Sequence, residues 1–121
     1  MIHISTNKFM KENITWNDFE KIDIRCGTVT EAKVFEKARK PAYQLLIDFG
    51  VLGNKRSSAQ ITAHYQPLEL VGRQVIAVVN FPPKQIGGFM SECLVLGVYD
   101  ADGTVVLLKA DKAMENGSKI G

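Results

Sequence analysis

The sequence contains few of the residues on which metal sites and disulfide frameworks depend. Among its 121 residues there are two cysteines and two histidines. Two thiols are too few for a disulfide framework in a domain of this size, so we expect Cys26 and Cys93 to be small buried residues. Neither His3 nor His64 lies near a cysteine at the spacing of metal ligands. We therefore expect no metal site and no cofactor.

The common catalytic motifs are also missing. The sequence has no P-loop, no Gly-x-Ser-x-Gly elbow and no His-Glu-x-x-His pair. Glu31 and Glu36 have no evident partner at a spacing suited to acid–base catalysis. His64 stands beside Tyr65, which favours a hydrogen-bonded structural pair over a catalytic base. The sequence therefore predicts a protein that is not an enzyme and has no catalytic residues.

Long apolar runs and a strong charge of one sign are lacking too. No run approaches the roughly 20 apolar residues of a membrane span, and residues 1–11 lack the unbroken apolar core of a secretory signal. We expect no membrane insertion and a cytoplasmic location. The net charge of +2 is small for a dedicated nucleic-acid protein, so RNA binding would need a local cationic patch.

Most of the chain has the alternating pattern of β-strands. Ile22, Ile24 and Cys26 alternate with polar residues. The strand contains Gly27, and the alternation slips after it, which predicts a long first strand bent by a bulge. A long bent strand can belong to both halves of a small closed barrel. Further strands are predicted over residues 43–49, 56–62, 74–79, 92–98 and 104–109, with a capped helix over residues 15–21 and helical or turn structure over residues 63–72.

The order of these elements indicates an all-β fold with short helices, a five-stranded OB-fold Greek-key barrel with N- and C-terminal extensions. The pattern alone does not separate an OB-fold from other small barrels. We divide the chain into an extension over residues 1–14 and a domain over residues 15–121. The apolar segment 104–109 lies beyond the five strands and needs cover, which a second copy would give in a homodimer. The alternative is that this segment caps its own barrel.

The segment between the predicted fourth and fifth strands is unusually apolar. It carries four bulky side chains, Phe81, Ile86, Phe89 and Met90, on a backbone that two prolines and two glycines turn away from regular structure. Such a loop either packs onto its own barrel or offers an apolar surface to a partner. A methionine beside phenylalanines favours an adaptable contact. These four residues are our candidates for binding a polypeptide.

Positive charge gathers on the elements that bind oligonucleotides in OB-folds, which are the face of the second and third strands and the loops beside it. The candidate cations are Lys37, Arg39 and Lys40 in the first loop, Arg56 on the third strand and Lys84 in the proline-rich loop. Ser58 and Gln60 share a polar face with Arg56 in the predicted strand. Glu36 offsets part of the first cluster, and a solvated charged surface is the alternative.

Several blocks of the sequence resemble the tRNA-binding domain family. They are DFEKIDIRCGTV at residues 18–29, SAQIT at residues 58–62, VIAVVNFPPK at residues 75–84 and GFMSE at residues 88–92. The resemblance runs from residue 15 to residue 121, and within the family the chain is most similar to the CsaA branch. Typical tRNA binders carry a His-Pro-x-Ala-Asp-Lys-Leu-like loop after the first strand, whereas EKARKPA at residues 36–42 is similar to the CsaA pattern.

The resemblance implies a cytoplasmic, non-enzymatic homodimer that holds unfolded or pre-export polypeptides as a chaperone, with the protein-export machinery as a further partner. Its alternative is a tRNA-binding module that uses the loop cations and the polar strand face. Ser91 and Glu92 match the Ser-Glu-Gly-Met stretch of tRNA binders, so they join the candidate nucleic-acid contacts. Cys93 and Leu94 depart from that stretch.

Overall fold

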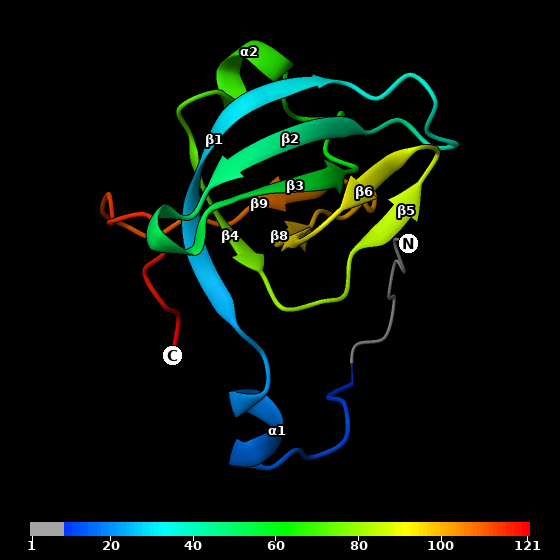
Figure 1. Cartoon of the computed structure of the whole chain (residues 1–121). Helices are drawn as coiled ribbons and strands as arrows, with labels where there is room; N and C mark the ends of the chain where they lie inside the picture. The colour runs from blue at the N-terminus through cyan, green and yellow to red at the C-terminus, as the bar shows by residue number, and fades with distance from the viewer. Residues whose placement is uncertain (1–8) are drawn as a thin grey trace.

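The barrel is built around one long strand, β1 (Ile24–Val34), in a computed structural model that describes residues 9–121 (Figure 1). The first half of β1 pairs with β4 (Gln74–Val78) and the second half with β2 (Tyr43–Asp48), both antiparallel. The prediction that one long strand serves both halves of the barrel is therefore confirmed.

The predicted bulge after Gly27 is confirmed. The register of β1 against β2 shifts between Val29 and Glu31. Gly27 itself is needed for packing, because a Cβ at that position would lie 2.7 Å from the Phe49 ring and 2.8 Å from the Ile47 side chain. The glycine thus lets β1 pass close over the core, and the irregularity in the strand follows further along the chain.

The main sheet has five strands in the order β3-β2-β1-β4-β7, which confirms the five-stranded OB-fold barrel. The third strand, β3 (Asn54–Ala59), begins and ends earlier than expected. The fifth strand, expected over residues 92–98, is divided into β7 (Leu94–Val95) and β8 (Gly97–Tyr99). Leu96 separates them. Its N–H still donates to Ile76 O of β4 at 2.8 Å, and beyond it β8 pairs with β9 (Val105–Leu107) as a separate hairpin.

The proline- and glycine-rich segment is not the irregular loop that we expected. It contains a hairpin of β5 (Lys84–Ile86) and β6 (Phe89–Ser91), seen at the right of Figure 1. Gly87 and Gly88 form its two-residue turn with φ of 52° and 85°. Two consecutive positive φ values give the turn whose twist matches a β-hairpin, so the glycines build regular structure rather than prevent it.

Two short α-helices and a 3₁₀ turn complete the fold. α1 (Trp16–Glu20) has the predicted capping box, in which Thr15 Oγ1 accepts from Asp18 N–H at 3.1 Å and Asp18 Oδ2 accepts from Thr15 N–H at 3.0 Å. It lies outside the barrel (Figure 1). α2 (Pro67–Leu70) lies within the predicted connection and has its proline at the first turn. The 3₁₀ turn is η1 (Gly50–Leu52).

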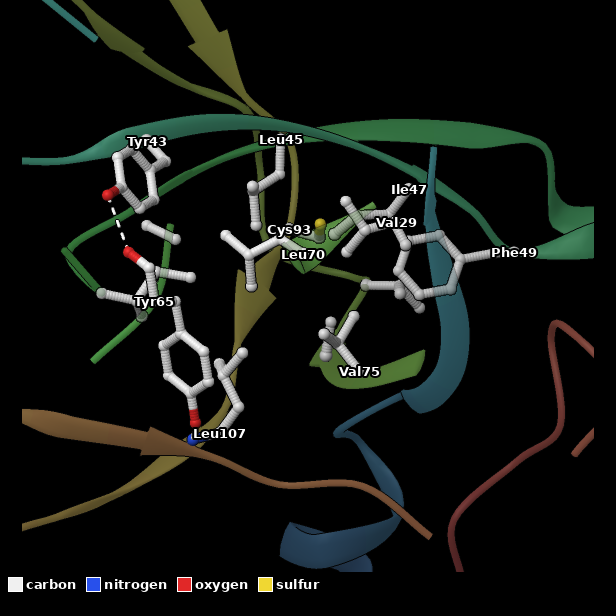
Figure 2. Packing of buried hydrophobic residues seen from close by; sticks show 14 residues of the cluster. Val29, Tyr43, Leu45, Ile47, Phe49, Tyr65, Leu70, Val75, Cys93 and Leu107 are labelled. Atoms are coloured by element: carbon white, nitrogen blue, oxygen red, sulfur yellow. Dashed lines mark hydrogen bonds between the residues drawn. The ribbon is translucent and has the colours of Figure 1, made fainter. Parts of the chain in front are cut away.

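The core lies inside the barrel and draws on every main strand (Figure 2). Its largest fully buried members are Phe49, Leu45, Ile47, Leu70, Val29 and Val75. Cys26 and Cys93 are free and buried, as expected. Tyr43 OH donates to Tyr65 O at 2.7 Å, and Tyr65 OH accepts from Leu107 N–H at 2.9 Å. The two tyrosines thus join β2, the connection before α2 and β9 with their polar ends satisfied.

The C-terminal tail forms part of the barrel. Cys26 N–H donates to Ser118 O at 2.9 Å, Gly117 N–H donates to Cys26 O at 2.7 Å, and Ile120 N–H donates to Ile24 O at 2.9 Å. The β1 residues that bond to the tail alternate with the β1 residues that bond to β4. The tail therefore pairs with the edge of the first half of β1 that faces away from β4. Among the described residues, no helix is long and apolar enough to cross a membrane.

Candidate binding groove

An open groove of about 420 Å³ runs across the outer face of β1, β2 and β3. Glu31, Leu46 and Arg56 stand side by side in the strand register, as do Lys33, Gln44 and Ser58. The groove is lined by Glu31, Ala32, Lys33, Gln44, Leu45, Leu46 and Arg56 from these strands, and by Phe89 from the β5–β6 hairpin. We call it the outer groove. It has an apolar floor and charges of both signs.

Phe89 forms the wall of the outer groove on the hairpin side. Its ring lies 5.4 Å from the Phe35 ring between centroids, tilted by 58°. Beyond this pair the groove continues between the loop after β1 and the hairpin turn, lined by Val34, Phe35, Glu36, Lys37, Gly87 and Gly88. The hairpin therefore stands over the groove, held in part by an aromatic contact worth about 0.5–1.5 kcal/mol beyond area burial.

The four predicted polypeptide-binding residues do not share one surface. Ile86 pairs with Phe89 in the hairpin, and both are half-buried. Met90 pairs with Gln85 on the opposite face, because successive side chains of a strand point to opposite sides. Met90 is 42% exposed and Phe81, which precedes the hairpin, is 53% exposed. The structure thus brings Phe89 to the groove with Ile86 beside it, and leaves Phe81 and Met90 elsewhere.

The predicted cations are distributed unevenly. Arg56 lines the outer groove and Lys37 its continuation. Arg39 and Lys84 are exposed outside both parts. Lys40 instead lines a separate hollow with Gln60 and Thr104, near the turn between β8 and β9. That hollow is continuous with one along the seam between β3 and β7, which is lined by Ser58–Ile61, Leu94–Gly97, Tyr99 and Val105.

Lys33 is a groove residue that sequence reasoning missed. It lines both the outer groove and its continuation. The register shift after Val29 turns Glu31 and Lys33 outward, in line with Gln44 and Leu46 of β2. The sequence offered one signal for this position, which was the break in the apolar–polar alternation of the first strand. That break indicated a bend, but it did not indicate which side chains would face outward beyond the bend.

Ser91 and Glu92 bond to the edge of β3. Ser91 Oγ accepts from Ser58 N–H at 3.1 Å, and Glu92 Oε1 accepts from Arg56 N–H at 3.0 Å. Glu92 N–H donates in turn to Arg56 O at 2.8 Å. Close by, Ser57 Oγ donates to Cys93 O at 2.9 Å in a buried position. The sequence Ser-Glu-Cys thus covers the edge of β3 at the point where the barrel closes.

The titratable groups of the barrel do not form a reactive centre. Burial raises the pKa of Cys93 to about 11, although a hydrogen bond from Ser57 and the charge of Lys55 lower it. Burial also raises the pKa of Cys26. Both thiols therefore stay protonated at neutral pH. Within residues 9–121, no three His, Cys, Asp or Glu side chains gather as metal ligands, and His3 lies outside that range.

His64 is tied to the turn between β8 and β9. Its Nε2 lies 2.7 Å from Thr104 Oγ1 and 3.5 Å from Asp100 Oδ2, and its ring meets the Tyr65 ring edge-on. Asp102 also accepts from Thr104, and these hydrogen bonds lower the pKa of its carboxyl group. The expected contact with Tyr65 is therefore an aromatic one, and the hydrogen bond of His64 goes to Thr104.

The fold and groove define an OB-type barrel with an open groove on its outer face. The family model described as "Putative tRNA binding domain" matches residues 24–119. The chain therefore belongs to the tRNA-binding domain family, and its CsaA-type character is confirmed by two solved structures. The chaperone CsaA from Bacillus anthracis str. Ames is 53% identical with a TM-score of 0.86, covering 91% of this chain and 100% of that one. The CsaA chaperone protein from Picrophilus torridus is 55% identical with a TM-score of 0.84, covering 90% and 100%.

A second group of relatives consists of aminoacyl-tRNA synthetases. The methionine–tRNA ligase of Parabacteroides distasonis is 38% identical over 113 residues, which are 93% of this chain and 16% of the ligase. The chain thus spans a small part of the curated relatives that it matches. The family to which it belongs is one of tRNA-binding and chaperone domains and not a catalytic one.

Proposed function

We propose that the protein is a CsaA-type chaperone that holds unfolded or pre-export polypeptides in the outer groove. The observation that carries the proposal is the position of Phe89, which is half-buried against Phe35 and lines both the groove and its continuation. Its ring is fixed in place yet accessible to a ligand. The high identity to CsaA chaperones over nearly the whole chain supports the same function.

The lining of the groove suits a polypeptide. Leu46 and Phe89 offer apolar surface, and burying one client side chain there would contribute roughly 1.5–3 kcal/mol. Glu31 stands across from Arg56 on the same face, so the groove carries both signs of charge. A polypeptide has apolar groups, amides and charges of both signs, whereas a polyanion would meet repulsion from the glutamate.

The test replaces Phe89 by serine and measures binding of a labelled, chemically unfolded protein together with the melting temperature. Phe89→Ser should weaken binding about tenfold or more, because it removes one buried apolar contact. The matched control is Leu68→Ser on α2, since Leu68 is 90% exposed and lies outside the groove. A destabilised Phe89→Ser protein whose folded fraction still binds normally would contradict the proposal.

Binding of tRNA is the second candidate function, and the family match supports it. Lys33, Lys37 and Arg56 place three cations along the groove and its continuation, against Glu31 and Glu36. Phe89 could stack on a base, and stacking on an aromatic side chain is worth about 1–3 kcal/mol per base. Salt dependence separates this function from polypeptide binding, because phosphate contacts release counterions and apolar contacts do not.

We further propose that the functional unit is residues 15–121 and that it acts as a homodimer. Val98 and Val106 face each other across β8 and β9, and they are 56% and 41% exposed. Leu107, the neighbour of Val106, is buried in the chain's own core. One side of the segment thus caps its own barrel, while the other side offers apolar surface that a second copy would cover. We place its action in the cytoplasm beside the protein-export machinery, where nascent polypeptide and tRNA both occur.

A further inference from the structure

The edge of β3 is bonded by side chains where a neighbouring strand would be expected. β3 is an edge strand of the main sheet. Its outward N–H groups at residues 56 and 58 donate hydrogen bonds to Glu92 Oε1 and Ser91 Oγ, respectively. Side chains that satisfy backbone groups in this way also blunt an edge that could otherwise pair with another chain. Ser91 and Glu92 are therefore engaged in the fold.

These two residues connect the segments that carry two sides of the outer groove. Ser91 is the last residue of β6, two positions after Phe89. Glu92 forms hydrogen bonds with both the backbone N–H and the backbone C=O of Arg56. Arg56 lines the outer groove on the side opposite Phe89. The contacts thus join the strand that carries one wall to the strand that carries the other.

The hairpin itself has little to hold it in place. β5 and β6 pair over only three residue pairs, and a two-stranded hairpin alone is marginally stable in water. Its position over the groove depends on contacts with the barrel. Among these are the Phe35–Phe89 ring contact and the bonds of residues 91–93 to β3.

We propose that Ser91 and Glu92 form a latch that positions the β5–β6 hairpin over the outer groove, and that they act as positioning residues, not ligand contacts. The latch sets the distance between Phe89 and the β3 wall. Its effect on ligand affinity rests on the proposed function of the groove, but its effect on the hairpin does not.

The experiment compares Glu92→Ala with Glu92→Gln by amide hydrogen exchange. Both variants lose the same charge, but glutamine keeps an oxygen that can accept from Arg56 N–H. Glu20→Ala controls for loss of a carboxylate on the exposed surface of α1. The amides of β4 serve as an internal reference, so that loss of global stability is separated from local opening. Binding of a labelled, chemically unfolded protein is measured on the same samples.

Glu92→Ala should raise exchange of the Arg56 amide and of residues 84–91 by about tenfold relative to β4, since it removes the side-chain oxygen that accepts from Arg56 N–H. Glu92→Gln and Glu20→Ala should exchange much as the wild type. Polypeptide affinity should fall about three- to tenfold in Glu92→Ala alone. Ser91→Ala should show the same changes more weakly, which covers the case in which Glu92→Ala folds poorly.

Unchanged exchange of the hairpin relative to β4 in both alanine variants would overturn the latch. Equal opening in Glu92→Ala and Glu92→Gln would also overturn it, because charge and not hydrogen bonding would then be responsible. Raised exchange with unaltered polypeptide binding would uphold the latch and reject polypeptide binding as the function of the groove.

Discussion

The two faces of β2 differ in burial at every residue along the strand. Tyr43, Leu45 and Ile47 are buried on the inner face, while the residues between them are half-exposed on the outer face. The inner face meets other apolar side chains at close packing, which explains its strict pattern. The outer face is shared with a hairpin from a distant part of the sequence. The core residues of β2 and those of the proposed binding groove therefore alternate along one strand, and each is one residue away from the other.

The largest expected effect lies on the inner face. Ile47→Ala should lower the free energy of unfolding by about 2–5 kcal/mol, because Ile47 is 0% exposed and its loss leaves a cavity. Leu46→Ala, the matched change on the outer face, should cost about 1 kcal/mol or less. Urea denaturation of both variants gives the two values. Similar losses would show that the outer face belongs to the core and is not a free binding surface.

The second prediction uses the buried thiol of Cys93. Burial raises its pKa from 9.0 to about 11, so the folded state resists ionisation that the unfolded state allows. The stability that Cys93 gives is therefore complete below pH 9 and is lost as the pH rises towards 11. The difference in unfolding free energy between wild type and Cys93→Ala should shrink over that interval, on the order of 2 kcal/mol.

The measurement is denaturant unfolding at several pH values, with the two proteins compared at each pH so that other groups cancel. A pH-independent difference would mean that Cys93 is reached by water in the folded state. That result would weaken the contrast between a closed interior and an open outer face.

The third prediction extends the comparison to the β8–β9 hairpin, which also has a core face and an exposed face. Light scattering should give twice the 13.4 kDa mass for the wild type and 13.4 kDa for Val106→Asp, because a charge would be buried at the proposed contact. Leu68→Asp, on exposed α2, should leave the mass unchanged. A wild-type mass of 13.4 kDa across micromolar concentrations would rule out the homodimer.

The smallest expected effect concerns the cations of the outer face. If tRNA binds in the groove, Lys33→Gln with Lys37→Gln should flatten the slope of log affinity against log salt by about 0.7–0.9 for each phosphate that is no longer neutralised. Arg39→Gln with Lys40→Gln removes the same charge from outside the groove and should change the slope less. Filter binding at several salt concentrations measures both. Equal slopes in the two double variants would indicate general attraction to the surface.

Much of the fold could be predicted because it depends on local patterns. The alternation in residues 43–49 gave β2 and its buried face, and the Thr15–Asp18 capping box placed α1. The errors lie where tertiary contacts override the pattern. The pattern predicted a bulge after Gly27, but it did not predict that the glycine makes room for Phe49. Two glycines predicted an irregular loop, but they build the turn of the β5–β6 hairpin.

The candidate site was less predictable than the fold. Of the expected cations, Arg56 and Lys37 line the outer groove or its continuation, while Lys40 and Gln60 lie at another hollow. Lys33 was missed because its direction depends on the exact residue at which β1 bends. Those assignments need the register between strands, which composition and periodicity do not specify.

The sequence by itself determined a small β-barrel and the apolar side chains that make the core, since periodicity and hydrophobicity act between near neighbours in the chain. The family followed from the resemblance of whole blocks of sequence. Only the tertiary structure decided which side chains form the groove, that Phe89 and Met90 lie on opposite faces, and that Ser91 and Glu92 bond to β3. The physical reason is the range of the interactions. The hydrogen bond between Arg56 and Glu92 joins residues that are 36 positions apart, and such a contact exists only once the barrel has closed.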